Sequence, residues 1–199
     1  MKPDTANLAA LIGSRICHDL ISPVGAVGNG LELIQMTNTL DQPEMQFITE
    51  SVEAARLRIL FFRIAYGLAV AGQMVGRDEV TSLLEGLYRD RRVKVHWKLT
   101  TAMERGEVRL AFLALQCVEA ALPYGGQITI SHNGGEWRIE GTGERLKVDQ
   151  ALWDNLAAVA PHSEVAPSDV QFALLPLLLR DTGRALLSSI DAAKVTIRF

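Results

Sequence analysis

The sequence has little cysteine, no long apolar run and no signal for secretion. Two cysteines in 199 residues, Cys17 and Cys117, cannot build a disulfide framework, and no His/Cys spacing resembles a metal site. We therefore expect two reduced, buried thiols and no bound metal. The longest apolar runs, such as 172–179, are too short to span a bilayer, and residues 1–10 lack the basic and apolar regions of a signal peptide. These absences predict a cytoplasmic protein with no membrane partner.

Positive charge is not concentrated either. Lys plus Arg number 20 against 23 Asp plus Glu, for a net charge of −3. The densest basic run, Arg89 to Lys94, is short and contains Asp90, so we expect no nucleic-acid partner. The chain is 48% hydrophobic, which excludes disorder and suffices for one large domain or two small ones.

Helical periodicity dominates residues 1–72. Apolar residues recur at steps of three and four over two stretches, 7–36 and 42–71, which is typical of helices that pair along a seam. The seam residues are Leu20, Val24, Val27, Leu31 and Ile34 in the first stretch, and Met45, Ile48, Val52, Ala55, Ile59, Phe62, Tyr66 and Ala69 in the second. Between them, Asp41 is a candidate N-cap and Pro43 a first-turn proline, so the second helix is predicted to begin there.

Residues 1–72 thus form a predicted helical hairpin. Two helices cannot enclose a core, so either the second half of the chain covers their apolar stripes or two chains pair. The long seam favours a homodimer whose two hairpins form a four-helix bundle.

Residues 73–199 mix both periodicities and predict a second domain. We expect helices over 78–88, 104–122, 147–159 and 170–181, and strands over 93–99, 127–131, 136–140, 184–189 and 194–199. A tight turn at 133–135 and a loop over 160–168 separate some of them. The pattern predicts a two-layer α/β sandwich with a mixed or antiparallel sheet of about four to five strands, and an α+β fold class for the whole chain.

One segment, 14–23, carries chemistry: Ser14-Arg15-Ile16-Cys17-His18-Asp19-Leu20-Ile21-Ser22-Pro23. At 100° per residue His18 lies opposite the apolar side of the helix, so its imidazole is predicted to face solvent. Ser22, Gly25 and Asn29 share its face and leave room for a partner to approach. Asp19 is suited to orienting the imidazole, and Arg15 to pairing with a phosphoryl group or an acidic partner. Pro23 removes a backbone donor one turn later, which predicts a helix break there, with a functional reason.

The string H-D-L-x-S-P resembles the H-box of histidine kinases, and residues 115–130 resemble the region around the kinase N-box helix. The departures are specific. Cys117 stands where the Mg²⁺-binding asparagine would be, Ile139-Glu140-Gly141-Thr142-Gly143 replaces the first glycine box, and residues 168–175 contain no glycine. ATP binding needs an acid, a metal ligand and glycines, so we predict an ATPase-like domain with no nucleotide-binding residues.

A hairpin with an intact H-box and a disabled ATPase-like domain resembles the ChpT-type histidine phosphotransferases of alphaproteobacteria. This resemblance implies a multistep phosphorelay in which His18 is the phospho-acceptor and Asp19 its acid/base partner. It implies a phosphoryl donor in the receiver domain of a hybrid histidine kinase (CckA-like) and acceptors in response regulators (CtrA-like and CpdR-like). The implied receiver-docking residues are Leu11, Ser14, Arg15, Ile21, Ser22 and Asn29. We expect no cofactor of its own, with Mg²⁺ on the partner receiver domain.

Three alternatives stay open at this point. The first is a histidine kinase with a divergent nucleotide site, and the second is a non-catalytic dimeric adaptor that binds receivers. The third, a small-molecule enzyme that uses the thiol of Cys17 or Cys117, is disfavoured.

Overall fold

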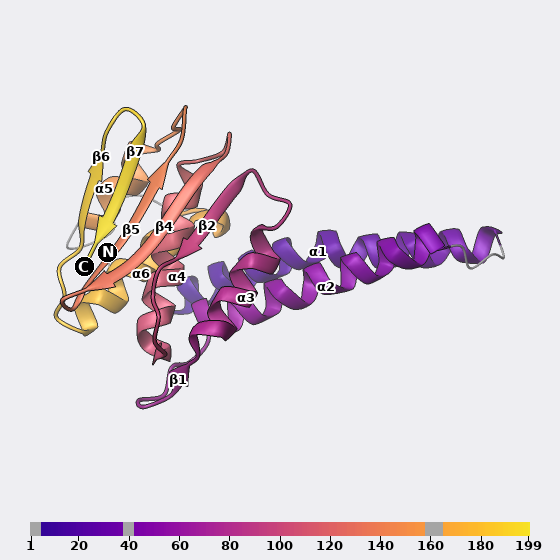
Figure 1. Ribbon diagram of the computed structural model, residues 1–199, viewed down its shortest axis with the longest axis horizontal. Helices are drawn as coiled ribbons and strands as arrows, with labels where there is room; N and C mark the ends of the chain where they lie inside the picture. The colour runs from indigo at the N-terminus through magenta and orange to yellow at the C-terminus, as the bar shows by residue number, and fades with distance from the viewer. Residues whose placement is uncertain (1–4, 38–41, 158–164) are drawn as a thin grey trace.

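The computed structural model describes residues 5–37, 42–157 and 165–199 (Figure 1). Two long helices are followed by a mixed α/β region. Its elements are α1 (Thr5–Thr37), α2 (Gln42–Ala65), β1 (Met74–Val75), α3 (Arg77–Tyr88), β2 (Val93–Trp97), β3 (Met103–Glu104), α4 (Arg105–Ala120), β4 (Gly126–Asn133), β5 (Glu136–Thr142), α5 (Gln150–Ala157), the 3₁₀ turn η1 (Pro167–Asp169), α6 (Gln171–Asp181), β6 (Leu187–Ile190) and β7 (Lys194–Arg198).

Helices α1 and α2 form a long hairpin that projects away from the α/β part (Figure 1). The hairpin predicted from periodicity is confirmed, whereas the proposed cap Asp41 lies outside the described residues. Helix α2 ends at Ala65 rather than near residue 71, so Tyr66 and Ala69 of the predicted seam lie beyond it. Gly67 follows, and a Cβ there would lie 2.2 Å from the carbonyl oxygen of Arg63, a close approach that only glycine permits.

The predicted helix break at Pro23 is wrong. Helix α1 runs without interruption from Thr5 to Thr37 and contains Pro23 in its interior. Proline gives no N–H to the carbonyl of Asp19, but the Pro23 side chain is buried in the hairpin. Packing of α1 along α2 therefore holds the helix together across the missing hydrogen bond.

In the described part of the α/β region, five strands form one sheet in the order β2-β4-β5-β7-β6. Only β2 and β4 are parallel within it, and the other neighbours are antiparallel. The α4 and α6 helices lie together on one face of this sheet (Figure 1). The α+β fold with a two-layer sandwich and a mixed sheet is confirmed.

The five predicted strands are all present, but each differs from its predicted bounds by one to three residues at one or both ends, and two further short strands appear. The last but one strand begins at Leu187 rather than at Arg184, because Gly183 makes a turn with φ +69° and the Arg184 side chain pairs with Glu107 on α4. The two-residue strands β1 and β3 pair antiparallel with each other and were missed, since two residues carry no periodicity. The turn between β4 and β5 is as predicted, with Gly134 and Gly135 both at positive φ.

The open end of the hairpin is built into the core of the sandwich. Leu8 of α1 and Phe61 of α2 are buried in the same cluster as α4, and the Phe61 ring stacks on Phe112 with centroids 4.6 Å apart. The outer surface of the hairpin instead leaves apolar side chains exposed. They are Val24, Leu31, Leu33 and Met36 of α1 and Met45, Phe47, Val52 and Ile59 of α2. None of the helices within the described ranges combines the length and apolarity needed to cross a membrane.

Candidate functional site

The His18 side chain lies on the outer surface of α1, beside the place where the sandwich meets the hairpin. It is 85% exposed, which confirms the orientation predicted from helical periodicity. Cys17, its neighbour, is also exposed, so the prediction that both thiols are buried is wrong for Cys17. Only Cys117 is buried, within α4, and burial raises the pKa of its thiol well above the ordinary value. Helix α1 thus presents an exposed imidazole to any approaching partner.

Asp19 holds one nitrogen of this imidazole. Its Oδ1 lies 3.1 Å from Nδ1 of His18. A carboxylate only accepts hydrogen bonds, so in the neutral ring this contact assigns the proton to Nδ1. The lone pair then belongs to Nε2, which is the free ring nitrogen. The pair therefore presents a nucleophilic nitrogen in a defined tautomer.

Arg15 in turn holds the Asp19 carboxylate. Its Nε donates to Oδ2 of Asp19 at 2.8 Å, one helical turn along α1, while its Nη1 donates to the backbone carbonyl of Ser168. The side chains of Arg15 and Asp19 are each 22% exposed, against 85% for His18. The two carboxylate oxygens of Asp19 are thus divided between the imidazole and the guanidinium.

A small cavity of about 40 Å³ lies behind Asp19, with Arg58 and Arg91 in its walls. Glu119 also lines it, accepting hydrogen bonds from the Tyr88 hydroxyl at 2.7 Å and from Arg91 at 2.9 Å. Burial, together with the charge of Arg91, lowers the pKa of Arg58. These residues come from α2, α3, α4 and the segment after α3. Sequence reasoning missed them, because no local pattern links them to residue 19.

The predicted docking residues do not all lie on one open surface. Ser14, Ile21, Ser22 and Asn29 are exposed on α1. Leu11, by contrast, is half-buried and packs against the core cluster. Arg15 is directed toward Asp19 and Ser168, as described above. The exposed members therefore extend along α1 on both sides of His18.

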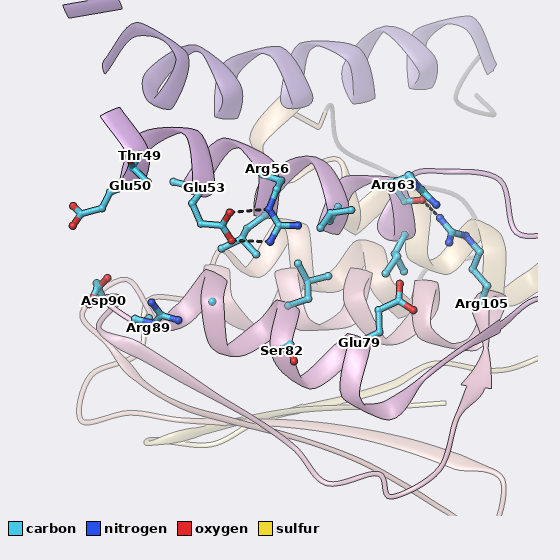
Figure 2. A pocket seen from close by; sticks show the side chains of 16 residues that line it. Thr49, Glu50, Glu53, Arg56, Arg63, Glu79, Ser82, Arg89, Asp90 and Arg105 are labelled. Carbon is cyan, nitrogen blue, oxygen red and sulfur yellow. Dashed lines mark hydrogen bonds and ion pairs between the residues drawn. The ribbon is translucent and has the colours of Figure 1, made fainter. Parts of the chain in front are cut away.

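A separate groove of about 840 Å³ lies between α2 and α3 (Figure 2). It is lined by four arginines and four acids, so it carries no excess of either charge. Figure 2 shows the Glu53–Arg56 ion pair and Arg105 directed to the carbonyl of Arg63. Nε of Arg56 lies 2.7 Å from Oε2 of Glu53. None of the residues predicted from the sequence lines this groove.

Two of the positions that the sequence resemblance matched to kinase nucleotide-binding residues lie in the core. Cys117 and Ile139, the latter where the first glycine box would carry its acid, are both fully buried. A Cβ on Gly141 would lie 2.4 Å from Val118, so this glycine allows β5 to pack closely on α4. Within the described residues, no group of three or more His, Cys, Asp or Glu side chains is arranged to hold a metal ion.

Comparisons with known proteins agree on one group. A family model described as the histidine phosphotransferase C-terminal domain matches residues 77–194. Protein phosphotransferase ChpT of Brucella abortus (strain 2308) is 30% identical over 183 residues, covering 89% of this chain and 87% of that protein. A solved bacterial phosphotransferase superposes with a TM-score of 0.80 at 26% identity, covering 100% of this chain and 98% of that one.

Proposed function

Because the chain belongs to the ChpT-type histidine phosphotransferases, we propose that His18 carries the phosphoryl group between two receiver domains. The phosphotransferase activity and the phosphorelay setting follow from the family. The identity of the phosphorylated residue, the two receivers and the direction of transfer are the proposal. The observation that carries it is a solvent-exposed imidazole whose Nδ1 is held by Asp19.

In the first step, the Nε2 lone pair of neutral His18 attacks the phosphorus of an aspartyl phosphate on the donor receiver. The N–P bond forms, the P–O bond to the aspartate breaks, and the aspartate leaves as a free carboxylate. Positive charge develops on the ring, and the Nδ1–H directed at Asp19 stabilises it. In the second step, the carboxylate of another receiver attacks the same phosphorus, and the ring leaves as neutral imidazole. No proton has to be gained or lost in either step.

Phosphoryl transfer has a loose, in-line transition state, so the proteins mainly position groups and neutralise charge. We place the Mg²⁺ that neutralises the phosphoryl oxygens on the receiver domain. The phosphoryl source is then the receiver rather than ATP. The burial of Cys117 and Ile139 in the core supports this choice.

The partners of this reaction are a second copy of the chain and at least two receivers. The exposed apolar stripe on the hairpin supports homodimerisation into a four-helix bundle. Ser14, Ile21, Ser22 and Asn29 supply the open surface around His18 for the receiver of a hybrid kinase (CckA-like) and for response regulators (CtrA-like, CpdR-like). Leu11 contributes at the edge of this surface, where it meets the core.

The test uses a hybrid-kinase receiver domain that carries a labelled phosphoryl group. The wild-type chain is expected to become labelled in an acid-labile form and to pass the label to a response-regulator receiver. His18→Ala is expected to abolish labelling, with the circular dichroism spectrum unchanged. His96→Ala, which removes another exposed histidine, on β2, is the matched control and should be labelled like wild type.

Full labelling of His18→Ala would overturn the assignment. Labelling of the wild type by Mg²⁺–ATP alone would identify a divergent kinase instead. A third result, receiver binding that is equal for wild type and His18→Gln with no acid-labile phosphate in either, would identify an adaptor.

A further inference from the structure

We propose that Arg15 is a positioning residue that couples the sandwich to the Asp19–His18 pair and acts on His18 through Asp19. This inference rests on the proposed function of His18 and assigns to Arg15 a role other than receiver docking. It starts from three contacts in series: His18 Nδ1 to Asp19 Oδ1, Asp19 Oδ2 to Arg15 Nε, and Arg15 Nη1 to the carbonyl of Ser168.

The rigid geometry of the guanidinium links the contact with Asp19 to the contact with Ser168. Its nitrogens lie in one rigid plane, so Nε and Nη1 cannot be reoriented independently. Along the edges of that plane, Nε donates to a carboxylate on α1, and Nη1 donates to a backbone carbonyl 153 residues away in the chain. A shift of the Ser168 carbonyl relative to α1 therefore moves the guanidinium and, with it, the acceptor that orients the His18 ring.

The segment that carries Ser168 is an ordered turn joined to the core of the sandwich. It is the 3₁₀ turn η1, in which the N–H of Asp169 donates to the carbonyl of Ala166 at 2.9 Å and the Ser168 hydroxyl donates to Asp169 at 2.8 Å. The turn leads directly into Val170, which is fully buried at the start of α6. The anchor point for Arg15 is thus part of the sandwich and moves with it.

Arg15 also acts through charge. It shares the Asp19 carboxylate with His18, so its removal leaves the carboxylate free to rotate away from Nδ1. Arg58 lies in the wall of the same small cavity and contributes positive potential at Asp19. The loss of Arg15 is therefore expected to weaken the orientation of the ring rather than to abolish it.

The test is a double-mutant cycle between Arg15→Ala and Asp19→Asn in the full-length chain. The rate of labelling from a phosphorylated receiver is measured as a function of receiver concentration. Arg15→Ala is expected to lower the rate at saturation by about 10-fold and to leave the half-saturating concentration within about twofold. In the Asp19→Asn background the same change should alter the saturated rate by less than about twofold.

A second readout needs no receiver. Ring ¹⁵N chemical shifts of His18 at alkaline pH report which nitrogen carries the proton. The wild-type ring should be mainly Nδ1–H, Arg15→Ala should shift the population toward Nε2–H, and Arg15→Lys should lie between them. Hydrogen exchange at residues 166–170 should become faster in Arg15→Ala. Arg56→Ala, which removes an exposed arginine paired with Glu53 on α2, is the control and should change neither readout.

A rise in the half-saturating concentration with an unchanged tautomer would instead make Arg15 a receiver contact and would overturn the proposal. So would equal effects of Arg15→Ala in the wild-type and Asp19→Asn backgrounds. Should Arg15→Ala fail to fold, Arg15→Lys carries the same cycle. If the wild type itself takes no label, the role of His18 fails, whereas the ring spectra still decide how Arg15 and Asp19 are coupled.

Discussion

Glu107, in the first turn of α4, is a carboxylate whose ionised form the fold stabilises. Arg184 donates to both of its oxygens, one at 2.9 Å, and the indole N–H of the buried Trp137 donates at 2.7 Å. The hydrogen bonds from Arg184, helped by Trp137, hold the pKa of Glu107 below its ordinary value, although burial opposes them. Because the native pKa is lowered, this group stabilises the fold at neutral pH, and that stabilisation is lost as the pH falls.

We predict that the free energy of unfolding decreases below about pH 5, where the unfolded carboxyl begins to bind its proton. Glu107→Gln should remove part of this pH dependence and lower stability at pH 7 by about 1–3 kcal/mol, since it weakens a charge-assisted pair. Urea unfolding at several pH values between 3.5 and 7 measures both effects. Glu136→Gln, on an exposed pair with Arg198 at 3.9 Å, should change little. A Glu107→Gln profile that coincides with wild type at every pH would contradict the prediction.

Among single residues, those that obey one local rule were predictable and those that meet across the chain were not. The exposure of His18 and its contact with Asp19 follow from helical geometry and adjacency. The contact of Arg15 with Ser168 joins residues 153 positions apart, and nothing in either neighbourhood indicates it. Free cysteine is commonly buried, which is the basis of the wrong prediction for Cys17, whereas the position of this thiol on α1 places it on the outer surface.

Among secondary-structure elements, α1 carries two nearby glycines, Gly28 and Gly30, whose surroundings differ. A Cβ on Gly30 would lie 2.6 Å from Cγ1 of Ile48 on α2, whereas a Cβ on Gly28 would meet nothing within 4 Å. Gly30→Ala should therefore destabilise the protein by about 1–2 kcal/mol, because α1 and α2 must move apart. Gly28→Ala should stabilise it by about 0.5–1 kcal/mol through helix propensity alone.

Urea unfolding at one fixed protein concentration compares the two variants, since association would otherwise add to the measured stability. The informative result is that the two substitutions change the free energy of unfolding in opposite directions. Equal stabilisation by both alanines would show that α1 and α2 are not in close contact at Gly30.

At the level of elements, the sequence predicts whether a segment is a helix or a strand better than it predicts where the element begins and ends. Periodicity identified both hairpin helices, the helices of the sandwich and its five longer strands, and all of these except the fully exposed β6 contribute a buried face. It could not place the end of α2, which depends on the contact between Gly67 and a carbonyl one turn earlier. The local cost of a proline predicts a break at Pro23, whereas the packing that α2 supplies keeps α1 continuous.

For the whole molecule, the decisive feature is that one core serves both parts. Phe61 of the hairpin stacks on Phe112 of the sandwich, so the proximal hairpin cannot move independently of the sheet and its helices. Only the distal hairpin projects (Figure 1). The sequence indicated a division near residue 72 but not this shared core, since the rings that meet lie 51 residues apart.

The exposed apolar stripe of the hairpin carries the prediction for assembly. Val52 and Ile59 lie seven residues apart on α2, on the same face, and each is about half exposed. Such a stripe is unfavourable in water and is covered when two hairpins pack as a bundle. The wild-type chain is therefore expected to be a dimer at micromolar concentration, and Val52→Glu combined with Ile59→Glu should make it a monomer, because charges buried in the bundle would lack partners.

Sedimentation velocity separates these states, and Leu187→Glu provides the control. Leu187 is an exposed apolar residue on β6, far from the hairpin stripe, so its variant should remain a dimer. A monomeric wild type, or a glutamate double variant that still dimerises, would contradict the four-helix bundle.

His18 lies on the outer surface of α1, so the monomeric variant should still accept label from a phosphorylated receiver if each protomer's own residues suffice for transfer. Loss of labelling together with loss of the dimer would show that the receiver-docking surface spans both protomers.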